Sequence, residues 1–341
     1  MIYLLILLLP VIVYFLNIYL IDRSILLNYS GDKHQKFTLE KKIPLSGGIF
    51  LSLCAMIIFH NFSQLNIFIF LIFLLGIFSD LKILNSAKFR FSLQIILLFL
   101  FIFINEIYIQ NTKVIFIDQL LNNKIFNYFF VLFCMLILIN GTNFIDGLNT
   151  NVLGYYIILS IFLSQTSNDY FTTTYAYWNL WIFILIILYL FNLFNKLFIG
   201  DSGSYLLGFF YGYIIIETYV LNQNLSPFYI VLLVWYPCFE TLFSIIRKFR
   251  LRKSPVLPDT KHFHQLLYQM IKKKLKLSNI KSNVLGANII NFYNLIIMFL
   301  ASIYSNNTQY QIILIFLNIL IYCYVYFYFF NFIYLKKIKF D

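Results

Sequence analysis

The stretch "LFIGDSGSYLLGF", residues 197–209, lies between two strongly apolar runs and carries a single carboxylate, Asp201, among glycines and serines. An aspartate before Ser-Gly-Ser is typical of a helix N-terminus, where the side chain caps free backbone N–H groups. A carboxylate at membrane depth costs about 3 kcal/mol unless a partner compensates it, and a divalent cation is such a partner. The stretch therefore predicts a helix that begins near residues 202–204, and an aspartate that either caps it or binds a cation.

Apolar residues dominate the chain around this stretch. Of the 341 residues, 61% are hydrophobic and 11% are charged, which is typical of a protein whose main solvent is lipid. Apolar runs of roughly 16 to 25 residues are long enough to cross a hydrocarbon core as helices. The sequence therefore predicts one all-α polytopic membrane domain, residues 1–341, with about eleven transmembrane helices near residues 2–21, 44–61, 65–79, 91–109, 126–142, 152–165, 174–191, 203–221, 226–246, 286–304 and 310–335.

The basic residues predict how this domain is oriented. If the N-terminus is outside, every Lys and Arg except Lys113 and Lys124 lies on the cytoplasmic side with the C-terminus, as the positive-inside rule requires. The formal net charge of +12 is then a topology signal and an attraction to anionic lipid. No nucleic-acid-binding motif accompanies it, so we expect no nucleic-acid partner. The cytoplasmic loops are predicted near residues 22–43, 80–90, 143–151, 192–202 and 247–285.

The polar clusters that look chemically purposeful all fall on this cytoplasmic side. They are "KKIPLSGGIF" (41–50), "GIFSDLKILNSAKFR" (76–90), "INGTNFIDGLNTN" (139–151), "NLFNKLFIGDSG" (192–203) and "SPVLPDTKHFHQLLY" (254–268). Their carboxylates favour Mg²⁺, which prefers oxygen ligands and substrate phosphates. Together with the nearby basic groups, such a cation suits a diphosphate. The clusters therefore predict phosphoryl transfer between a water-soluble and a lipid substrate.

Each cluster also has a simpler interpretation when it is taken alone. Asp80 could be an ordinary loop aspartate that pairs with a neighbouring lysine. His262 and His264 could be solvated loop histidines, followed by an amphipathic helix that lies on the inner leaflet. Four polar residues recur every three positions: Asn140, Asn143, Asp146 and Asn149. Side chains that cap a turn would explain one or two of them, but not readily all four.

Taken together and in order, the five motifs resemble those of the polyprenyl-phosphate sugar-1-phosphate transferases of the glycosyltransferase 4 type. The resemblance runs from about Lys41 to Tyr268. "PDTKHFHQLL" is similar to the N-acetylglucosamine branch and lacks the triple histidine of the phospho-N-acetylmuramoyl-pentapeptide transferase branch. The resemblance implies a multi-pass enzyme of the bacterial inner membrane that transfers a sugar-1-phosphate from a UDP-amino sugar to undecaprenyl phosphate, releases UMP and initiates cell-envelope glycan synthesis.

The resemblance also implies roles for individual residues. Asp201 matches the ligand of Mg²⁺, for which Mn²⁺ could substitute, and Asp80 matches a residue that handles the lipid phosphate as base or orienting charge. His262 and His264 match histidines near the diphosphate. The residues expected to bind the nucleotide or support its charge are Asn143, Asp146, Gly147, Asn192, Phe198, Lys261 and Arg247.

Three residues depart from the pattern of the family, each with a neutral group where a titratable one is usual. Ser79 replaces the first aspartate of a pair, Asn149 replaces a second aspartate after "DGL", and Gln265 replaces a third histidine. These departures leave open the interpretation that the chain is an inactive paralogue of the family. Two different functions also stay open: the pentapeptide-sugar transferase, and a transporter or flippase, for which Glu217 and Glu240 are the deep charges. The amino sugar and a homodimer stay undecided.

Overall fold

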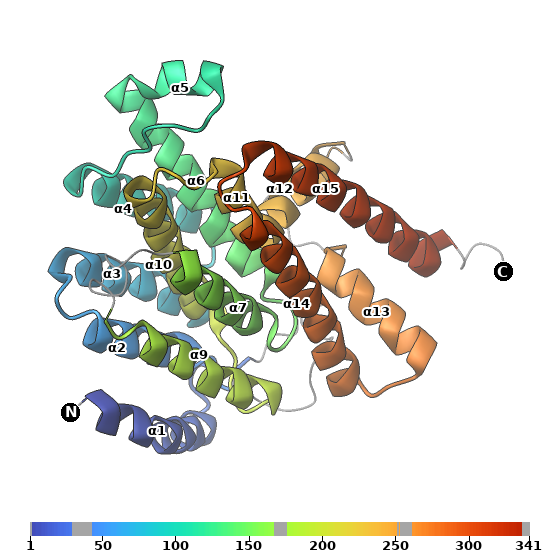
Figure 1. Ribbon diagram of the computed structural model, residues 1–341. Coiled ribbons are helices and arrows are strands. Elements are labelled where there is room, and N and C mark those ends of the chain that lie inside the picture. Colours follow the sequence, from blue (N-terminus) through green and yellow to red (C-terminus); the bar gives the residue numbers. More distant parts are fainter. Residues whose placement is uncertain (1, 29–42, 167–175, 251, 253–260, 336–341) are drawn as a thin grey trace.

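The computed structural model describes residues 2–28, 43–166, 176–250, 252 and 261–335. Within these ranges the regular structure is helical, apart from an isolated antiparallel bridge between Leu27 and Pro44 (Figure 1). The predicted all-α fold class is therefore confirmed. Residues 41 and 42 of the first motif and residues 254–260 of the last motif lie outside the described ranges.

Every apolar run predicted from the sequence coincides with a helix. In chain order these are α1 (Ile2–Asp22), α2 (Gly47–Ile58), α3 (Ser63–Asp80), α4 (Ala87–Ile104), α6 (Lys124–Ile145), α7 (Asn151–Thr166), α9 (Trp178–Leu193), α10 (Gly200–Leu221), α11 (Pro227–Leu233) with α12 (Trp235–Arg250), α14 (Asn279–Ile303) and α15 (Thr308–Phe330). Three further pieces complete the described chain: α5 (Ile115–Leu121), α13 (Phe263–Leu275) and a π-helical turn, η1 (Asn331–Leu335).

Fewer helices are long enough to cross a membrane than the sequence predicts. In the part of the chain that the structure describes, six are long and apolar enough, namely α3, α4, α6, α10, α14 and α15. The pair α11 and α12, bent by 81°, would make a seventh. Helices α2, α7 and α9 are apolar but have only 12 to 16 residues. At 1.5 Å per residue, such helices fall short of a core about 30 Å thick.

Helix α10 lies at the centre of the bundle, between α3, α2 and α6 (Figure 1). Its first half is rich in small residues, which allows the neighbouring backbones to come close. A Cβ on Gly76 of α3 would lie 2.2 Å from the Cα of Ser202, and a Cβ on Gly208 would lie 2.6 Å from the Cα of Ile139 on α6. The glycines at these positions therefore hold α3 and α6 tightly against α10.

Successive apolar helices present alternate ends to the region around the start of α10. The segment that precedes α10 follows the end of α9 and contacts the end of α1 and the start of α2. The side chain of Asn17 on α1 donates to the carbonyl of Lys196 (3.0 Å), and the N–H of Gly47 on α2 donates to the carbonyl of Phe198 (2.9 Å). The end of α3, the start of α4 and the end of α6 contribute side chains to α10 itself. The chain thus reverses direction from each of these helices to the next.

Helix α13 begins at Phe263, where the amphipathic pattern starts, but it does not have the environment that the sequence suggests. Leu266, Leu267 and Ile271 are buried, and the helix packs against α14 and α15. The lysines at 272–274 and 276 are exposed. Most of the apolar stripe therefore packs against the protein itself, whereas Leu275 at its end is exposed.

Candidate active site

Asp201 lies in the first turn of α10, and its carboxylate turns toward other helices. One oxygen, Oδ1, accepts a hydrogen bond from Nδ2 of Asn143 on α6 (2.7 Å). The other, Oδ2, accepts from Oγ of Ser79 on α3 (2.5 Å) and from Nη1 of Arg90 on α4 (2.6 Å). The helix begins at Gly200, slightly before the predicted position, and Ile199 is its N-cap residue without a side-chain cap. Asp201 therefore does not cap its own helix.

Asp80 supplies that cap from the end of α3. Its Oδ1 accepts from the N–H of Asp201 (2.8 Å), and its Oδ2 accepts from the N–H (3.1 Å) and Oγ (2.7 Å) of Ser202. Gly200 makes this approach possible because its φ is +73° and a Cβ there would lie 2.6 Å from Oδ2 of Asp80. Asp80 is thus no ordinary loop aspartate. Since both of its oxygens hold α10, the geometry favours the orienting role over the base.

Arg90 and Ser79 complete what we call the carboxylate cluster: Ser79, Asp80, Arg90, Asn143 and Asp201. Nη1 of Arg90 donates to Ser79 Oγ as well as to Asp201, so a single guanidinium nitrogen links the departure at Ser79 to the predicted metal ligand. Arg90 is absent from the set of residues inferred from the sequence. The available signal is a basic residue in the polar cluster that follows Asp80, which resembles an ordinary loop charge when it is considered alone.

Asp146 follows α6, three residues after Asn143, and is half-buried. Within the described residues its carboxylate accepts no hydrogen bond. Burial, together with the negative charges of Asp201 and Asp80, raises the pKa of Asp146 well above its usual value. A cation or a hydrogen-bond donor from a substrate would relieve this penalty.

His262 and His264 stand side by side at the start of α13. Their rings are stacked, with centroids 5.7 Å apart and planes at 9°. Both ring nitrogens of His264 are buried and have no hydrogen-bond partner in the described part of the chain. Burial and the neighbouring charge of His262 lower the pKa of His264 to about 3, so this imidazole is neutral at physiological pH.

The histidines meet the predicted nucleotide motif through Gly147. A Cβ at this position would lie only 2.1 Å from Nε2 of His264, so the imidazole fills the space that glycine leaves. Phe144 lies on the other side, with its ring centroid 5.4 Å from that of His262. The structure therefore brings Asp80, Asn143, Asp146, Asp201, His262 and His264 to one end of the bundle.

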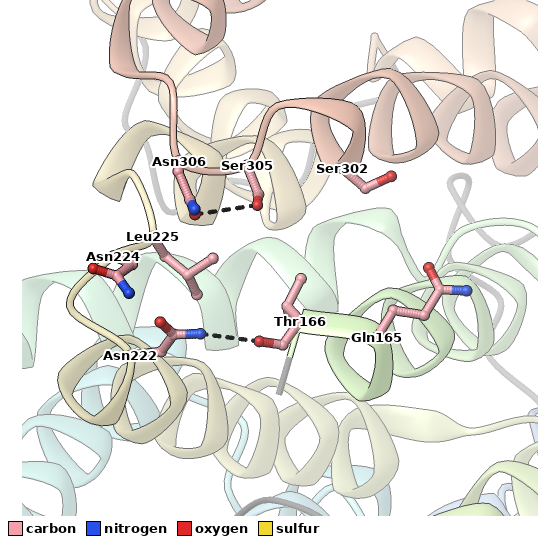
Figure 2. Close-up of a pocket in the computed structure, with 8 residues that line it drawn as sticks. All are labelled: Gln165, Thr166, Asn222, Asn224, Leu225, Ser302, Ser305 and Asn306. Atoms are coloured by element: carbon pink, nitrogen blue, oxygen red, sulfur yellow. Dashed lines mark hydrogen bonds between the residues drawn. The ribbon is translucent and has the colours of Figure 1, made fainter. Parts of the chain in front are cut away.

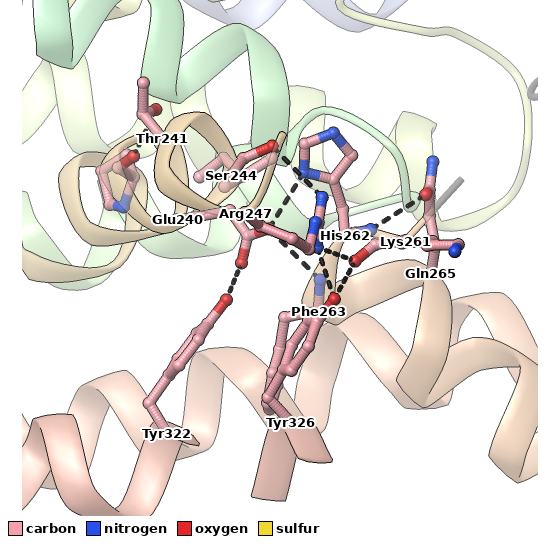
Figure 3. A network of polar contacts seen from close by, with 12 residues as sticks. Glu240, Thr241, Ser244, Arg247, Lys261, His262, Phe263, Gln265, Tyr322 and Tyr326 are labelled. Carbon is pink, nitrogen blue, oxygen red and sulfur yellow. Dashed lines mark hydrogen bonds and ion pairs between the residues drawn. The ribbon is translucent and has the colours of Figure 1, made fainter. Parts of the chain in front are cut away.

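Glu240 supports the histidines from α12, although the sequence indicates only that it is a deep charge. It is fully buried, and one of its oxygens lies 2.9 Å from Nδ1 of His262 (Figure 3). We call Glu240, His262 and His264 the histidine cluster. Lys248, also on α12, is buried with its ammonium 5.9 Å from the centre of the Phe144 ring, so it is a second basic residue that the sequence patterns do not single out.

Two of the predicted charge-supporting residues hold the histidine segment in place. Arg247 donates from Nη1 to the carbonyl of Lys261 (2.5 Å) and to the hydroxyl of Tyr326 (2.5 Å), as Figure 3 shows. The ammonium of Lys261 lies 5.3 Å and 5.2 Å from the ring centres of Phe330 and Tyr334. These contacts favour a structural role for Arg247 and place the Lys261 ammonium beside aromatic rings.

The predicted contacts to the nucleotide base are likewise tied to the protein. Asn192 is buried, donates to the carbonyl of Leu197 (2.7 Å) and accepts from the N–H of Thr150. These bonds favour a structural role, because they join the end of α9 to the start of α7. Phe198 pairs its backbone with Pro44 and Gly47, and its side chain is half-buried, so its contact with the base stays a prediction.

The remaining two departures also have a structural explanation. Asn149 is buried, and its amide donates to the carbonyl of Asn192 (3.3 Å) and to the side chain of Asn195. The side chain of Gln265 accepts from the N–H of His262 (3.3 Å) in a capping box at the start of α13. A neutral amide therefore serves local structure at both positions.

The donor set fits Mg²⁺ only in company with substrate phosphates. The described residues contain no group of three or more His, Cys, Asp or Glu side chains that could hold a metal by themselves. Asp201 nevertheless offers a carboxylate that is 28% exposed, although its two oxygens accept hydrogen bonds from Ser79, Arg90 and Asn143. Mg²⁺ usually binds through one or two carboxylates and completes its shell with phosphate oxygens and water, so this single carboxylate could hold it only together with a substrate diphosphate.

A pocket of about 340 Å³ lies elsewhere, at the opposite ends of α7, α10 and α14 (Figure 2). It is separated from Asp201 by the length of α10, which is roughly 30 Å at 1.5 Å per residue. Asparagines, serines, a threonine, a glutamine and a leucine line it, and no charged side chain is among them. None of the residues in either cluster contributes to this pocket.

Comparison with known proteins agrees with the geometry. The profile of glycosyl transferase family 4 matches residues 39–219, more than half of the chain, and this range contains the whole carboxylate cluster. The chain belongs to glycosyl transferase family 4. As a member of this family, it is similar to the undecaprenyl-phosphate alpha-N-acetylglucosaminyl 1-phosphate transferase of Thermotoga maritima, with 26% identity over 68% of this chain and 70% of the relative.

Two further relatives extend the comparison. The Salmonella typhi protein of the same name is 27% identical over 66% of this chain and 65% of its own length. The decaprenyl-phosphate N-acetylglucosaminephosphotransferase of Mycolicibacterium smegmatis is 37% identical over 22% of this chain and 21% of its own. The match therefore covers about two thirds or less of the length of most of these relatives.

Proposed function

We propose that this family 4 protein transfers N-acetylglucosamine-1-phosphate, or a closely related amino-sugar phosphate, from a UDP-sugar to undecaprenyl phosphate. The observation that carries the proposal is the convergence of Asp80, Asn143 and Asp201 from three helices at the first turn of α10. These residues lie in the matched region, and the relatives named above act on polyprenyl phosphates according to their names.

In the proposed reaction an oxygen of the lipid phosphate attacks the β-phosphorus of the UDP-sugar. The bond from that phosphorus to the bridging oxygen breaks, UMP leaves, and a lipid diphosphate sugar forms. Asp201 would hold Mg²⁺, which neutralises the diphosphate when it is bound. Asp80 keeps Asp201 and the α10 N-terminus in position, and that N-terminus itself favours anions. Asn143 fixes the orientation of the Asp201 carboxylate from α6.

The histidine cluster would bind the donor from the other side. His264 is neutral and buried beside Gly147 of the nucleotide motif, and its ring nitrogens make no hydrogen bond within the described residues. Asp146 lies next to this glycine and gains most from a ligand that donates a hydrogen bond. We therefore assign the diphosphate and the nucleoside to the space between Asp201 and His264.

We further propose that the chain crosses the bacterial inner membrane eleven times, with its N-terminus outside and the site facing the cytoplasm. The alternate helix ends around α10 support this number, since each apolar helix runs opposite to the one before it. The positions of Lys and Arg support the orientation. The short helices α2, α7 and α9 would then require a locally thin bilayer or polar neighbours at their ends.

A transporter is the less favoured function. Transport needs charged side chains within the apolar region, as in many proton and ion pathways. Glu240, one of the two candidates, contacts His262 at the site and is thereby part of the proposed enzyme. Glu217 accepts a hydrogen bond from Tyr213 on its own helix (3.3 Å).

UMP release tests the proposal. Purified protein in detergent with undecaprenyl phosphate and Mg²⁺ is given a panel of UDP-sugars. We expect UMP from UDP-N-acetylglucosamine or a close epimer, only when the lipid phosphate is present, and none after chelation. Asp201→Asn should lower the rate at least about 1,000-fold. The control Glu106→Gln removes an exposed carboxylate that pairs with Lys124 and should leave the rate unchanged. No UMP from any UDP-sugar would contradict the proposal.

A further inference from the structure

The buried carboxylate of Glu240 is bound mainly by the segment that carries the two histidines. It is 0% exposed and receives three donors: Nδ1 of His262 (2.9 Å), the backbone N–H of Phe263 (3.2 Å) and the hydroxyl of Tyr322 (Figure 3). A buried carboxylate is tolerated only when it is paired and hydrogen-bonded. Two of the three donors belong to the segment that carries the histidines, so the charge is aimed at that segment.

The contact with His262 decides what this ring can offer a substrate. Because Nδ1 faces the carboxylate, that nitrogen carries the proton, and Nε2 is left as the ring atom that can meet a ligand. The ring cannot turn away easily, because His264 stacks on it at 5.7 Å and Phe144 lies at 5.4 Å. A ring that carries a proton on both nitrogens would present Nε2 as an N–H donor toward phosphate oxygen.

The contact with Phe263 fixes where helix α13 begins. The Phe263 N–H is one of the free first-turn donors of α13, and Glu240 accepts from it across the helix interface. The side chain of Gln265 accepts from the N–H of His262 in the same turn. The carboxylate thereby sets the start of the helix, and with it the positions of both histidines relative to Gly147.

We propose that Glu240 is a positioning residue for His262 in the sugar-phosphate transfer, so that Nε2 of His262 meets the donor diphosphate; this inference rests on the proposed function. Glu240 itself touches no substrate. Its effect on turnover passes through His262, whereas its effect on stability would pass through α13 and α15. These two routes predict different results when His262 is absent.

A double-mutant cycle on UMP release separates the two routes. Glu240→Gln keeps the shape and removes the charge, and we expect it to lower kcat about 30-fold with the KM for UDP-N-acetylglucosamine changed less than about threefold. In a His262→Gln background the same change should lower kcat less than about threefold further, because the residue that it positions is gone. Glu240→Asp retains the charge and should recover part of the lost kcat.

Two controls make the outcome decisive. Glu217→Gln neutralises the other glutamate of the apolar helices, on α10, and should leave kcat unchanged. If Glu240→Gln does not fold, Glu240→Asp in the two backgrounds replaces it in the cycle. Equal losses with and without His262, or a wild-type kcat in a folded Glu240→Gln variant, would overturn the inference. Wild-type protein that releases no UMP would overturn the proposed function itself, and the inference with it.

Discussion

The carboxylate cluster and the histidine cluster are adjacent parts of one site that handle charge in opposite ways. In the carboxylate cluster the charges are partly exposed and compensate one another, with Arg90 on Asp201 and the α10 N-terminus on Asp80. In the histidine cluster one buried carboxylate, Glu240, holds one imidazole, and the other imidazole is neutral with nitrogens that lack a partner among the described residues. The first arrangement suits a cation and phosphates, and the second suits a ligand that brings its own hydrogen bonds.

The difference also extends to how each cluster is built. The carboxylate cluster joins the ends and starts of four helices directly, and all of it lies within the family match at residues 39–219. The histidine cluster lies beyond that range and depends on supporting residues from α12 and α15. A site of this kind therefore needs both direct chemistry and a second set of residues that orients it.

After the loss expected for Asp201→Asn, the next largest effect is expected when the cap on α10 is weakened. Three donors converge on the two oxygens of Asp80, and Asp80→Asn would turn an amide N–H₂ toward at least one of them. We expect UMP release to fall about 100-fold. Asp118→Asn is the matched control, since Asp118 accepts from the N–H and the hydroxyl of Thr112 near α5, at the far end. Similar rates for the two variants would remove Asp80 from the site.

The contact between the clusters can be broken at Gly147. Gly147→Ala places a Cβ against Nε2 of His264 and should displace the imidazole, which lowers UMP release about 10- to 100-fold. Gly212→Ala on α10 is the control, because the nearest atom to its Cβ would be 3.6 Å away. A Gly147→Ala enzyme with the wild-type rate would show that His264 does not act at the nucleotide motif.

His264 of the histidine cluster and Asp146, which lies between the clusters in the nucleotide motif, should also respond oppositely to pH in metal-free protein. Because the folded-state pKa of His264 is lowered to about 3, the unfolded chain binds more protons, and this residue destabilises the fold by roughly 2 kcal/mol as pH falls from 6.5 to 5. Asp146 has a raised pKa, so its ionisation destabilises the fold as pH rises from about 4 upward.

Thermal unfolding in detergent measures this opposition. The Tm of His264→Phe relative to wild type should be higher at pH 5 than at pH 8. For Asp146→Asn the order reverses, with the larger gain, a few degrees, at pH 8. Parallel shifts of both variants across this pH range would mean that burial does not affect the two groups as described.

The smallest effect is expected at Ser79. Its hydroxyl contacts Asp201 and Arg90, and Arg90 can pair with a second carboxylate. We therefore expect Ser79→Asp to release UMP within about threefold of wild type. A folded but inactive variant would show that this member of the family requires a neutral group there.

Sequence reasoning reached the fold class and most of the site, because apolar runs and polar motifs are local signals. The helices of all eleven runs and the junction at Asp201 follow from such patterns, and Asp80, Asn143 and His264 are singled out by the resemblance of their motifs to the family. The pattern could not show which aspartate caps α10, since Asp80 reaches it across about 120 residues of chain. A separation of that length along the chain does not indicate whether the two residues are close in the folded protein.

Other features depend on tertiary partners that no local pattern contains. Arg247 and Asn192 are basic and polar residues in plausible places, yet their groups bind backbone carbonyls of neighbouring segments. Arg90 and Glu240 are the opposite case, because each gains its place in the site from a distant partner: Arg90 from Asp201, and Glu240 from His262. A charge within an apolar run, as at Glu240, is nevertheless a usable signal.

The central claim is that segments far apart in the chain meet around one divalent cation. Cleavage by Fe²⁺ and ascorbate, with Fe²⁺ in place of Mg²⁺ and UDP-N-acetylglucosamine present, tests this directly, because bound iron cuts only nearby backbone. We predict cuts close to Asp80, Asp146, Asp201 and His264 together, all lost in Asp201→Asn and unchanged in Glu106→Gln. Cuts in a single segment, or cuts that persist in Asp201→Asn, would contradict the account.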